Sequence, residues 1–237
     1  MRFNTTDYLE ARTLAELAIK LDPNYAFAWA TLGFTWWWDG RLGYTGDSES
    51  KFQRADELAH RAMELNNTVS WVIGLNALAA APLGRYAEGV EIARRGVALY
   101  PSNADIRGFL AFSLMHAAQY EEAVQHFRAA MVLNPFYPVW YSTGLSTTLR
   151  ALGKLDESLT LSDEVINRQP LHLQSWLNRA YVYHLKGRHS EAKAVLKDIE
   201  RIAPNVRAHH VTRFSLLDDP VMNEKVANGL RELGLPD

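Results

Sequence analysis

The chain has 237 residues, of which 48% are hydrophobic and 22% charged, with 14 Gly and 9 Pro. These proportions are typical of a folded globular chain and exclude a disordered or fibrous one. The formal net charge is −2 at pH 7, so the chain lacks the basic excess that nucleic-acid or membrane-surface binding requires. The absence of cysteine excludes disulfides, thiol nucleophiles and Cys-ligated zinc.

A turn signal recurs along the chain with a nearly constant step. It stands at Pro23, Asn67, Pro101, Pro135, Pro170 and Pro204, with gaps of 44, 34, 34, 35 and 34 residues. A second series keeps the same gaps with small residues: Ala11, Ala55, Gly89, Ala123, Ser158 and Ala192. Proline ends a helix, and a small residue lets a neighbouring helix approach closely. The two series predict a stack of helical hairpins with a period of about 34 residues.

In chain order, we expect a single solenoid over residues 1–237. Its units are a truncated repeat with only a second helix (1–24), a repeat with an inserted loop (25–67), four regular repeats (68–101, 102–135, 136–170 and 171–204) and capping helices (205–237). The first unit leaves an apolar end uncovered, which predicts that the chain is a fragment of a longer protein or that a second copy covers this end.

Two further segments depart from the regular pattern. The insertion, about ten residues from Asp39 to Ser48, is rich in glycine and polar residues, which predicts a surface loop. Beyond Pro204 we expect one helix over Val206–Leu217 and another from Pro220 to about Leu233, with Asp219 as its N-cap.

These features resemble the tetratricopeptide repeat, a 34-residue helix–turn–helix unit. Trp29, Leu32, Gly33 and Trp36 match the signature of its first helix. The signature of its second helix is matched by Tyr8-Leu9-Glu10-Ala11, Tyr86-Ala87-Glu88-Gly89, Tyr120-Glu121-Glu122-Ala123 and His189-Ser190-Glu191-Ala192. The resemblance implies an all-α, right-handed α-solenoid of antiparallel helix pairs, whose first helices line a concave face.

No pattern in the sequence predicts an active site. There is no Gly-x-Ser-x-Gly elbow, Gly153-Lys154 lacks the remaining glycine of a phosphate-binding loop, and no two histidines are spaced i, i+4. We therefore expect a non-catalytic chain with no metal site and no cofactor.

The family frame places certain positions of each first helix on the concave face. These positions give the predicted binding residues: Phe27, Phe34, Trp37, Trp38, Trp71, Phe112, Met115, His116, Tyr141, Tyr181 and His184. The Lys and Asn clamp with which chaperone-binding members hold a carboxylate tail is absent, so an apolar or aromatic segment is the expected ligand. Two interpretations stay open for Trp37 and Trp38, namely an exposed binding surface or packing beneath the inserted loop.

A narrower resemblance concerns the run Leu21–Tyr25, the Trp-rich first helix and the ending Gly229–Pro236. These are similar to the C-terminal repeat region of bacterial signalling proteins, in which a class III adenylate or guanylate cyclase domain or a winged-helix DNA-binding domain precedes the repeats. The resemblance implies the regulatory module of a larger protein, with any cyclase activity outside this chain.

The expected partner is therefore a protein, a peptide or the module's own effector domain, with no nucleic acid. The alternatives are a small-ligand sensor that uses the same groove and a homodimer formed through the uncovered first helix. The sequence contains neither a signal peptide nor an apolar run of about 20 residues, so we expect no membrane insertion and a cytoplasmic location by default.

Overall fold

The computed structural model describes residues 5–42, 47–208 and 219–237, and these ranges are helical throughout apart from short connections. The helices are α1 (Thr5–Leu21), α2 (Ala26–Leu42), α3 (Ser48–Leu65), α4 (Ser70–Ala80), α5 (Tyr86–Leu99), α6 (Ala104–His116), α7 (Tyr120–Leu133), α8 (Val139–Ala151), α9 (Leu155–Arg168), α10 (Leu173–Leu185), α11 (His189–Ile202) and α13 (Pro220–Leu233), with a short 3-10 helix, η1, at Ala81–Leu83. The predicted all-α solenoid is confirmed.

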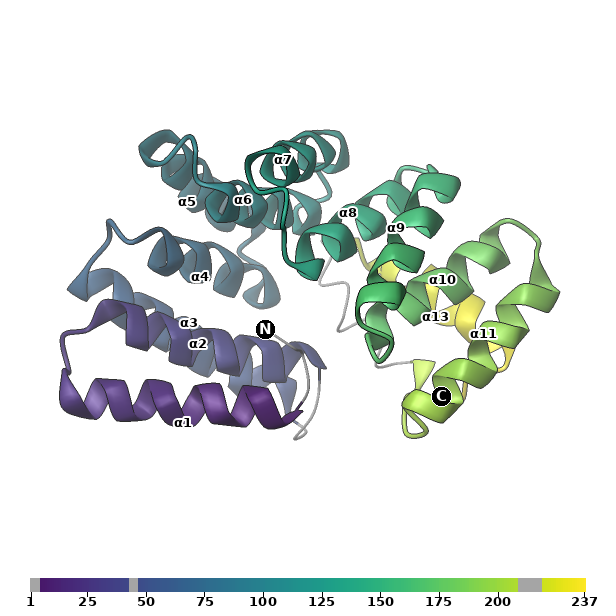
Figure 1. Cartoon of the computed structure of the whole chain (residues 1–237), viewed down its shortest axis with the longest axis horizontal. Coiled ribbons are helices and arrows are strands. Elements are labelled where there is room, and N and C mark those ends of the chain that lie inside the picture. The colour runs from purple at the N-terminus through teal and green to yellow at the C-terminus, as the bar shows by residue number, and fades with distance from the viewer. Residues whose placement is uncertain (1–4, 43–46, 209–218) are drawn as a thin grey trace.

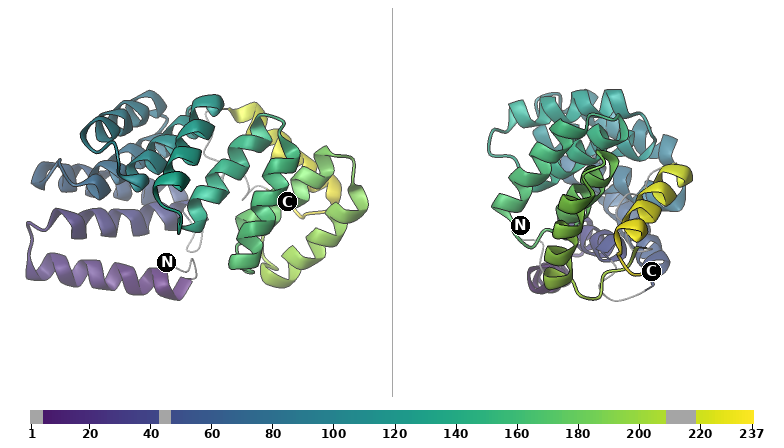
Figure 2. Two further views of the ribbon diagram at one scale, coloured as in Figure 1. Left: turned by 45° about the horizontal axis from the view of Figure 1, so that its top comes forward. Right: turned by 90° about the vertical axis from the view of Figure 1, so that its right-hand side faces the viewer.

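The helices form successive hairpins that stack into an arch (Figure 1). Each first helix (α2, α4, α6, α8, α10) packs against its own second helix (α3, α5, α7, α9, α11), and successive first helices pack against one another. In Figure 1, α1 to α3 lie at one foot of the arch, α5 to α7 at its crown, and α10, α11 and α13 at the other foot. Figure 2 shows the same succession from two further directions.

A left-handed turn separates the two helices of most hairpins. Gly84, Gly153 and Gly187 have φ values of 75°, 72° and 69°, a conformation that glycine adopts without a steric penalty. Ala118 occupies the equivalent turn with a φ of 56°. The positive φ at these turns is the reason that glycine stands at three of them.

The first four residues of the insertion do not form the surface loop that its composition predicts. Residues 39–42 continue α2, and α3 already begins at Ser48, so both helices are several residues longer than those of the later hairpins. Asp39, Gly40 and Arg41 are buried. The prediction was wrong for residues 39–42 because these polar groups find partners inside the fold. Residues 43–46 lie outside the described part of the chain.

The last helix closes the second half of the stack. Asp219 caps α13, its carboxylate accepting the backbone N–H of Met222 at 2.8 Å, and Pro220 is the first helical residue, as predicted. α13 packs against α10 and α11, and its buried Val226 and Leu230 join their apolar core. Of the other predicted helix, Val206–Leu217, residues 209–218 lie outside the described residues.

Candidate functional site

A row of aromatic rings crosses the first helices from one hairpin to the next. Its members, which we call the aromatic row, are Tyr25, Phe27, Trp71, Phe109, Trp140, Tyr141 and Tyr137. Neighbouring ring centroids in this order lie 6.0, 6.1, 5.6, 5.4, 4.2 and 6.2 Å apart. Apart from the distance between Trp140 and Tyr141, which are neighbours in the chain, these distances fall within the range of favourable aromatic pairs, about 4.5–7 Å. The row therefore forms one continuous contact path from α2 to α8.

Two glycines inside helices make this row possible. A Cβ at Gly74 of α4 would lie 2.2 Å from the ring of Phe109, and a Cβ at Gly108 of α6 would lie 2.5 Å from the indole of Trp140. Any larger residue would therefore clash with the ring. Glycine costs about 0.5–1 kcal/mol in a helix relative to alanine, and here that cost is offset because the next ring lies directly on the helix backbone.

Solvent reaches some members of the aromatic row but not others. Phe27 is 41% exposed, Tyr25 is also exposed, and Trp71, Tyr137 and Trp140 are half-buried. Phe109 and Tyr141 are buried. The aromatic row thus combines buried rings with rings that retain exposed surface.

Tyr141 holds neighbouring hairpins together instead of facing a ligand. Its ring is fully buried, and its hydroxyl donates to Asp105 of α6 at 2.7 Å. Burial and the Asp105 carboxylate raise the pKa of Tyr141 well above its ordinary value. The half-buried Trp140, one residue earlier, holds the position equivalent to Trp71, because the linker before α8 contains one residue more than the other linkers. The placement of Tyr141 on an open face is corrected accordingly.

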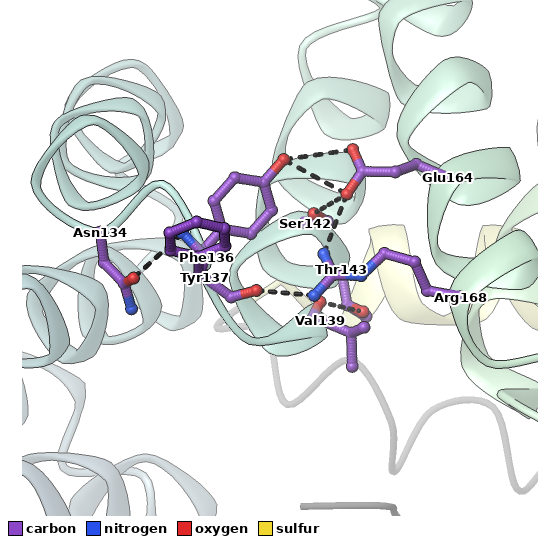
Figure 3. A network of polar contacts seen from close by, with 8 residues as sticks. All are labelled: Asn134, Phe136, Tyr137, Val139, Ser142, Thr143, Glu164 and Arg168. Carbon is purple, nitrogen blue, oxygen red and sulfur yellow. Dashed lines mark hydrogen bonds and ion pairs between the residues drawn. The ribbon is translucent and has the colours of Figure 1, made fainter.

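A polar network holds the linker that leads into α8 (Figure 3). The Tyr137 hydroxyl lies 3.2 and 3.3 Å from the two carboxylate oxygens of Glu164. Arg168 donates to Glu164 at 3.1 Å and to the backbone carbonyl of Tyr137 at 2.7 Å, and Ser142 also donates to Glu164. α9 therefore fixes the segment that carries the last rings of the aromatic row.

Trp37 is fully buried and belongs to the core. Its indole N–H donates to the backbone carbonyl of Leu78 at 3.0 Å, and its ring packs edge-on against Trp38 at 4.9 Å. The Arg41 guanidinium lies 5.2, 5.6 and 5.7 Å from the rings of Trp37, Trp38 and Phe112. The interpretation of Trp37 as part of an exposed binding surface is therefore wrong. Trp38 keeps part of its surface exposed.

Arg41 and Asp39, near the end of α2, are charged residues with buried side chains. Burial lowers the pKa of Arg41 to about 9. Asp39 forms ion pairs of 3.3 Å with Arg12 of α1 and with the buried Lys51 of α3. The extra turns of α2 and α3 thus bring together a buried charged cluster that binds three helices to one another.

Comparison with known proteins identifies the repeat. Residues 75–138 and 143–206, more than half of the chain, match the family model described as Tetratricopeptide repeat. The chain belongs to the tetratricopeptide repeat (TPR) family. Members of this family are generally non-catalytic scaffolds for protein–protein interaction. No curated protein matches the TPR chain in sequence.

Solved structures share the TPR fold at low sequence identity. The Cut9–Hcn1 hetero-tetramer of the APC/C is 16% identical with a TM-score of 0.69, over 94% of this chain and 39% of that one. PilW, a type IV pilus biogenesis factor, is 14% identical with a TM-score of 0.61, over 78% and 83% of the two chains. YrrB, a TPR protein with an unusual peptide-binding site, is 17% identical with a TM-score of 0.52, over 92% and 97%. This chain therefore spans well under half of the Cut9–Hcn1 chain.

The remaining predicted binding residues of the TPR frame are mostly covered. Phe34 is buried against Trp71, with 4.4 Å between ring centroids, and Phe112, Met115 and His116 are also buried. Tyr181 is buried because α13 lies on α10, where Gly229 leaves room for the rings of Tyr181 and His184. Only Phe27, Trp38, Trp71 and His184 of the predicted set retain exposed surface.

Tyr25, Tyr137 and Trp140 of the aromatic row retain exposed surface but were not among the predicted binding residues. The signal that was available is Gly74 and Gly108, spaced 34 residues apart inside first helices. Among the described residues, no group of His, Asp and Glu side chains could hold a metal ion. None of the described helices is long and apolar enough to cross a membrane.

Proposed function

We propose that this TPR chain is a protein-interaction module that binds a peptide or a helix of another protein along the aromatic row. The observation that carries the proposal is the continuity of the row, which joins four first helices and exposes Phe27 beside the half-buried Trp71 and Trp140. Aromatic side chains dominate the energetics of binding surfaces, because they bury a large area at a small cost in conformational entropy.

The ligand best suited to this surface is a segment with apolar or aromatic side chains. Flat rings favour stacking and apolar contact, and the exposed end of the row, at Tyr25 and Phe27, carries no ionised group on its rings. YrrB, a structural relative, is described as having a peptide-binding site, which supports peptide binding by analogy of fold alone.

The setting that we propose is a larger bacterial signalling protein in the cytoplasm, in which this chain regulates an effector domain such as a nucleotide cyclase or a winged-helix domain. The support is the similarity of Leu21–Tyr25 and Gly229–Pro236 to the repeat regions of such proteins. In that setting the segment bound by the aromatic row belongs either to the effector domain or to a separate protein.

Selection from a random peptide library displayed on phage tests the proposal. The wild-type chain should enrich peptides with aromatic or large apolar residues. Their Kd, measured by fluorescence anisotropy, should rise at least about tenfold for the variant F27A/W71A, which corresponds to about 1.4 kcal/mol. The control F136A removes an aromatic ring that is 95% exposed and outside the row, so its Kd should stay within about twofold of wild type.

Two results would refute this function. One is a selected peptide whose Kd is unchanged in F27A/W71A, because binding would then occur elsewhere. The other is an equal loss of affinity in F136A, because the peptides would then bind exposed rings without preference. Far-UV circular dichroism of each variant shows whether the helices are retained.

A further inference from the structure

A leucine stripe on α1 faces away from the rest of the molecule. Leu14, Leu17 and Leu21 are 58%, 51% and 79% exposed. The opposite side of α1 packs on α2 through the buried Ala15. Figure 1 shows α1 as the outermost helix at its foot of the arch, with no helix beyond it. A contiguous apolar stripe of this kind marks a contact surface.

The positions of the later second helices that are equivalent to Leu14 pack against neighbouring helices. The matching residues of the later second helices are Leu58, Ile92, His126, Leu161 and Val195. Leu58, Ile92 and Val195 are only 1%, 6% and 4% exposed, and His126 and Leu161 are half-buried. Leu14 is therefore the same kind of core residue without its cover.

The position of Leu17 shows whether the first helix of another repeat or a different partner would bury the stripe. At its position the later second helices carry Arg61, Arg95, Ala129, Glu164 and Asp198, none of which is buried. The first helix of a repeat therefore covers the position of Leu14 but leaves that of Leu17 at the margin. An additional TPR first helix would therefore not bury a leucine at position 17. A partner that buries the whole stripe must contact the face of α1 that carries Leu17 as well as Leu14.

We propose that the partner is a second copy of this chain, whose α1 packs antiparallel against the first across a two-fold axis. Positions 10, 14, 17 and 21 alternate in steps of four and three, which is the spacing of a helix–helix seam. In the antiparallel arrangement Leu14 packs against Leu17 of the second copy, and the two-fold symmetry repeats that contact. The seam thus has two leucine pairs at its centre.

The charges beside the stripe agree with this orientation. Glu10 lies in line with the stripe near the start of α1, and Lys20 lies beside Leu21 near its end; both are exposed. When Leu14 meets Leu17 of the second copy, Glu10 faces Leu21 of that copy, and the adjacent Lys20 lies within reach of its carboxylate. A parallel pair would instead place Glu10 beside Glu10. The face is therefore complementary to itself only when antiparallel.

Sedimentation velocity over a loading series up to about 1 mM tests the proposal, because that range detects even weak dimers. The wild-type chain should shift from monomer to dimer with concentration, and L14Q/L17Q should raise the dimer Kd at least about tenfold. The control L99Q/V132Q replaces two exposed apolar residues of α5 and α7 and should dimerise like wild type. A wild-type chain that remains monomeric overturns the proposal, as does a dimer that L14Q/L17Q leaves intact.

A charge exchange tests the orientation, independently of the leucines. E10K and K20E should each weaken the dimer, since each brings like charges together. The double variant E10K/K20E, or a mixture of the two single variants, should restore it. If neither restores the dimer, the antiparallel arrangement is wrong. Because Phe27 and Trp71 of the aromatic row are untouched, peptide binding reports separately on the proposed function.

Discussion

The indole N–H of Trp37 donates to the backbone carbonyl of Leu78 at 3.0 Å, across 41 residues of sequence. The bond joins the extended first helix α2 to the end of α4 in the next hairpin. Trp37 is also fully buried and contacts Trp38 at 4.9 Å. One side chain therefore satisfies a buried carbonyl and fills the joint between two hairpins.

W37A should destabilise the fold more than it affects any binding surface. Loss of a buried tryptophan typically costs about 3–5 kcal/mol in the free energy of unfolding, and W37F should cost about 1–3 kcal/mol because the Leu78 carbonyl loses its donor. Urea unfolding followed by circular dichroism measures both values. W38A, at a half-buried position, should cost less than W37A. Equal costs for W37A and W38A would contradict the assigned role of Trp37.

D39N should lower the free energy of unfolding, because it removes the acidic charge from the buried charged cluster. Asp39 pairs at 3.3 Å with Lys51, and the two side chains are only 1% and 6% exposed. Removal of one partner from a buried ion pair costs about 3–5 kcal/mol, because the other charge remains in a poorly solvated site. The control E57Q breaks the exposed ion pair of Glu57 with Arg54 and should cost at most about 1 kcal/mol. Similar urea midpoints for the two variants would contradict the stabilising role of the charged cluster.

A118G should stabilise the chain. Ala118 has a φ of 56° at a turn where the equivalent residues are glycines. Relief of left-handed strain gains about 1–2 kcal/mol, and the added freedom of the unfolded chain removes about 0.4–1 kcal/mol of that gain. The melting temperature should therefore rise modestly. G153A, the reverse change in the next hairpin, should lower it. A fall in the melting temperature of A118G would contradict the strained conformation.

The stability of the fold should decrease below neutral pH. Burial and the nearby Arg41 charge hold the pKa of His116 well below 6.5, and the same two causes lower the pKa of His172 to about 4. Between pH 6.5 and about 4 the unfolded chain therefore binds protons that the folded chain does not. Stability must fall as the pH falls through that window.

H116L isolates the share of this pH dependence that His116 contributes. It removes a buried ring whose two nitrogens form no hydrogen bond, so stability at pH 7.5 should not decrease. The fall in unfolding free energy as the pH drops below 6.5 should become smaller, by up to about 1.4 kcal/mol per pH unit, the linkage of one proton. Urea unfolding at several pH values measures this slope. A slope equal to that of wild type would show that His116 is protonated in the fold.

The repeat was predictable from the sequence, whereas the polar interior of its first full hairpin was not. The turn series from Pro23 to Pro204 indicated the hairpins, because proline and small residues act locally. The burial of Asp39 and Arg41 depends on Lys51, Arg12 and the tryptophan rings, which the chain brings together only after folding. Composition alone therefore indicated a loop at residues 39–42, where α2 continues.

The aromatic row shows a similar limit. Phe27 and Trp71 were predicted from the TPR frame, and they do retain exposed surface. The position of Trp140 depends on the glycine at 108, in the preceding hairpin, and on one extra linker residue. With the gap of 35 that replaces 34 here, the position equivalent to Trp71 is Trp140 and not Tyr141.

The most direct test of the interaction surface is an indole N–H spectrum of the ¹⁵N-labelled chain, titrated with a peptide selected for binding. The signal of Trp71 should move with saturation at the peptide's Kd, since its half-buried ring is a member of the aromatic row, and that of the half-buried Trp140 should move with it. The signals of Trp29 and Trp176 should stay fixed, since their N–H groups donate to the carbonyls of Pro23 and Pro170. Movement of Trp29 and Trp176 without Trp71 and Trp140 would contradict binding along the aromatic row.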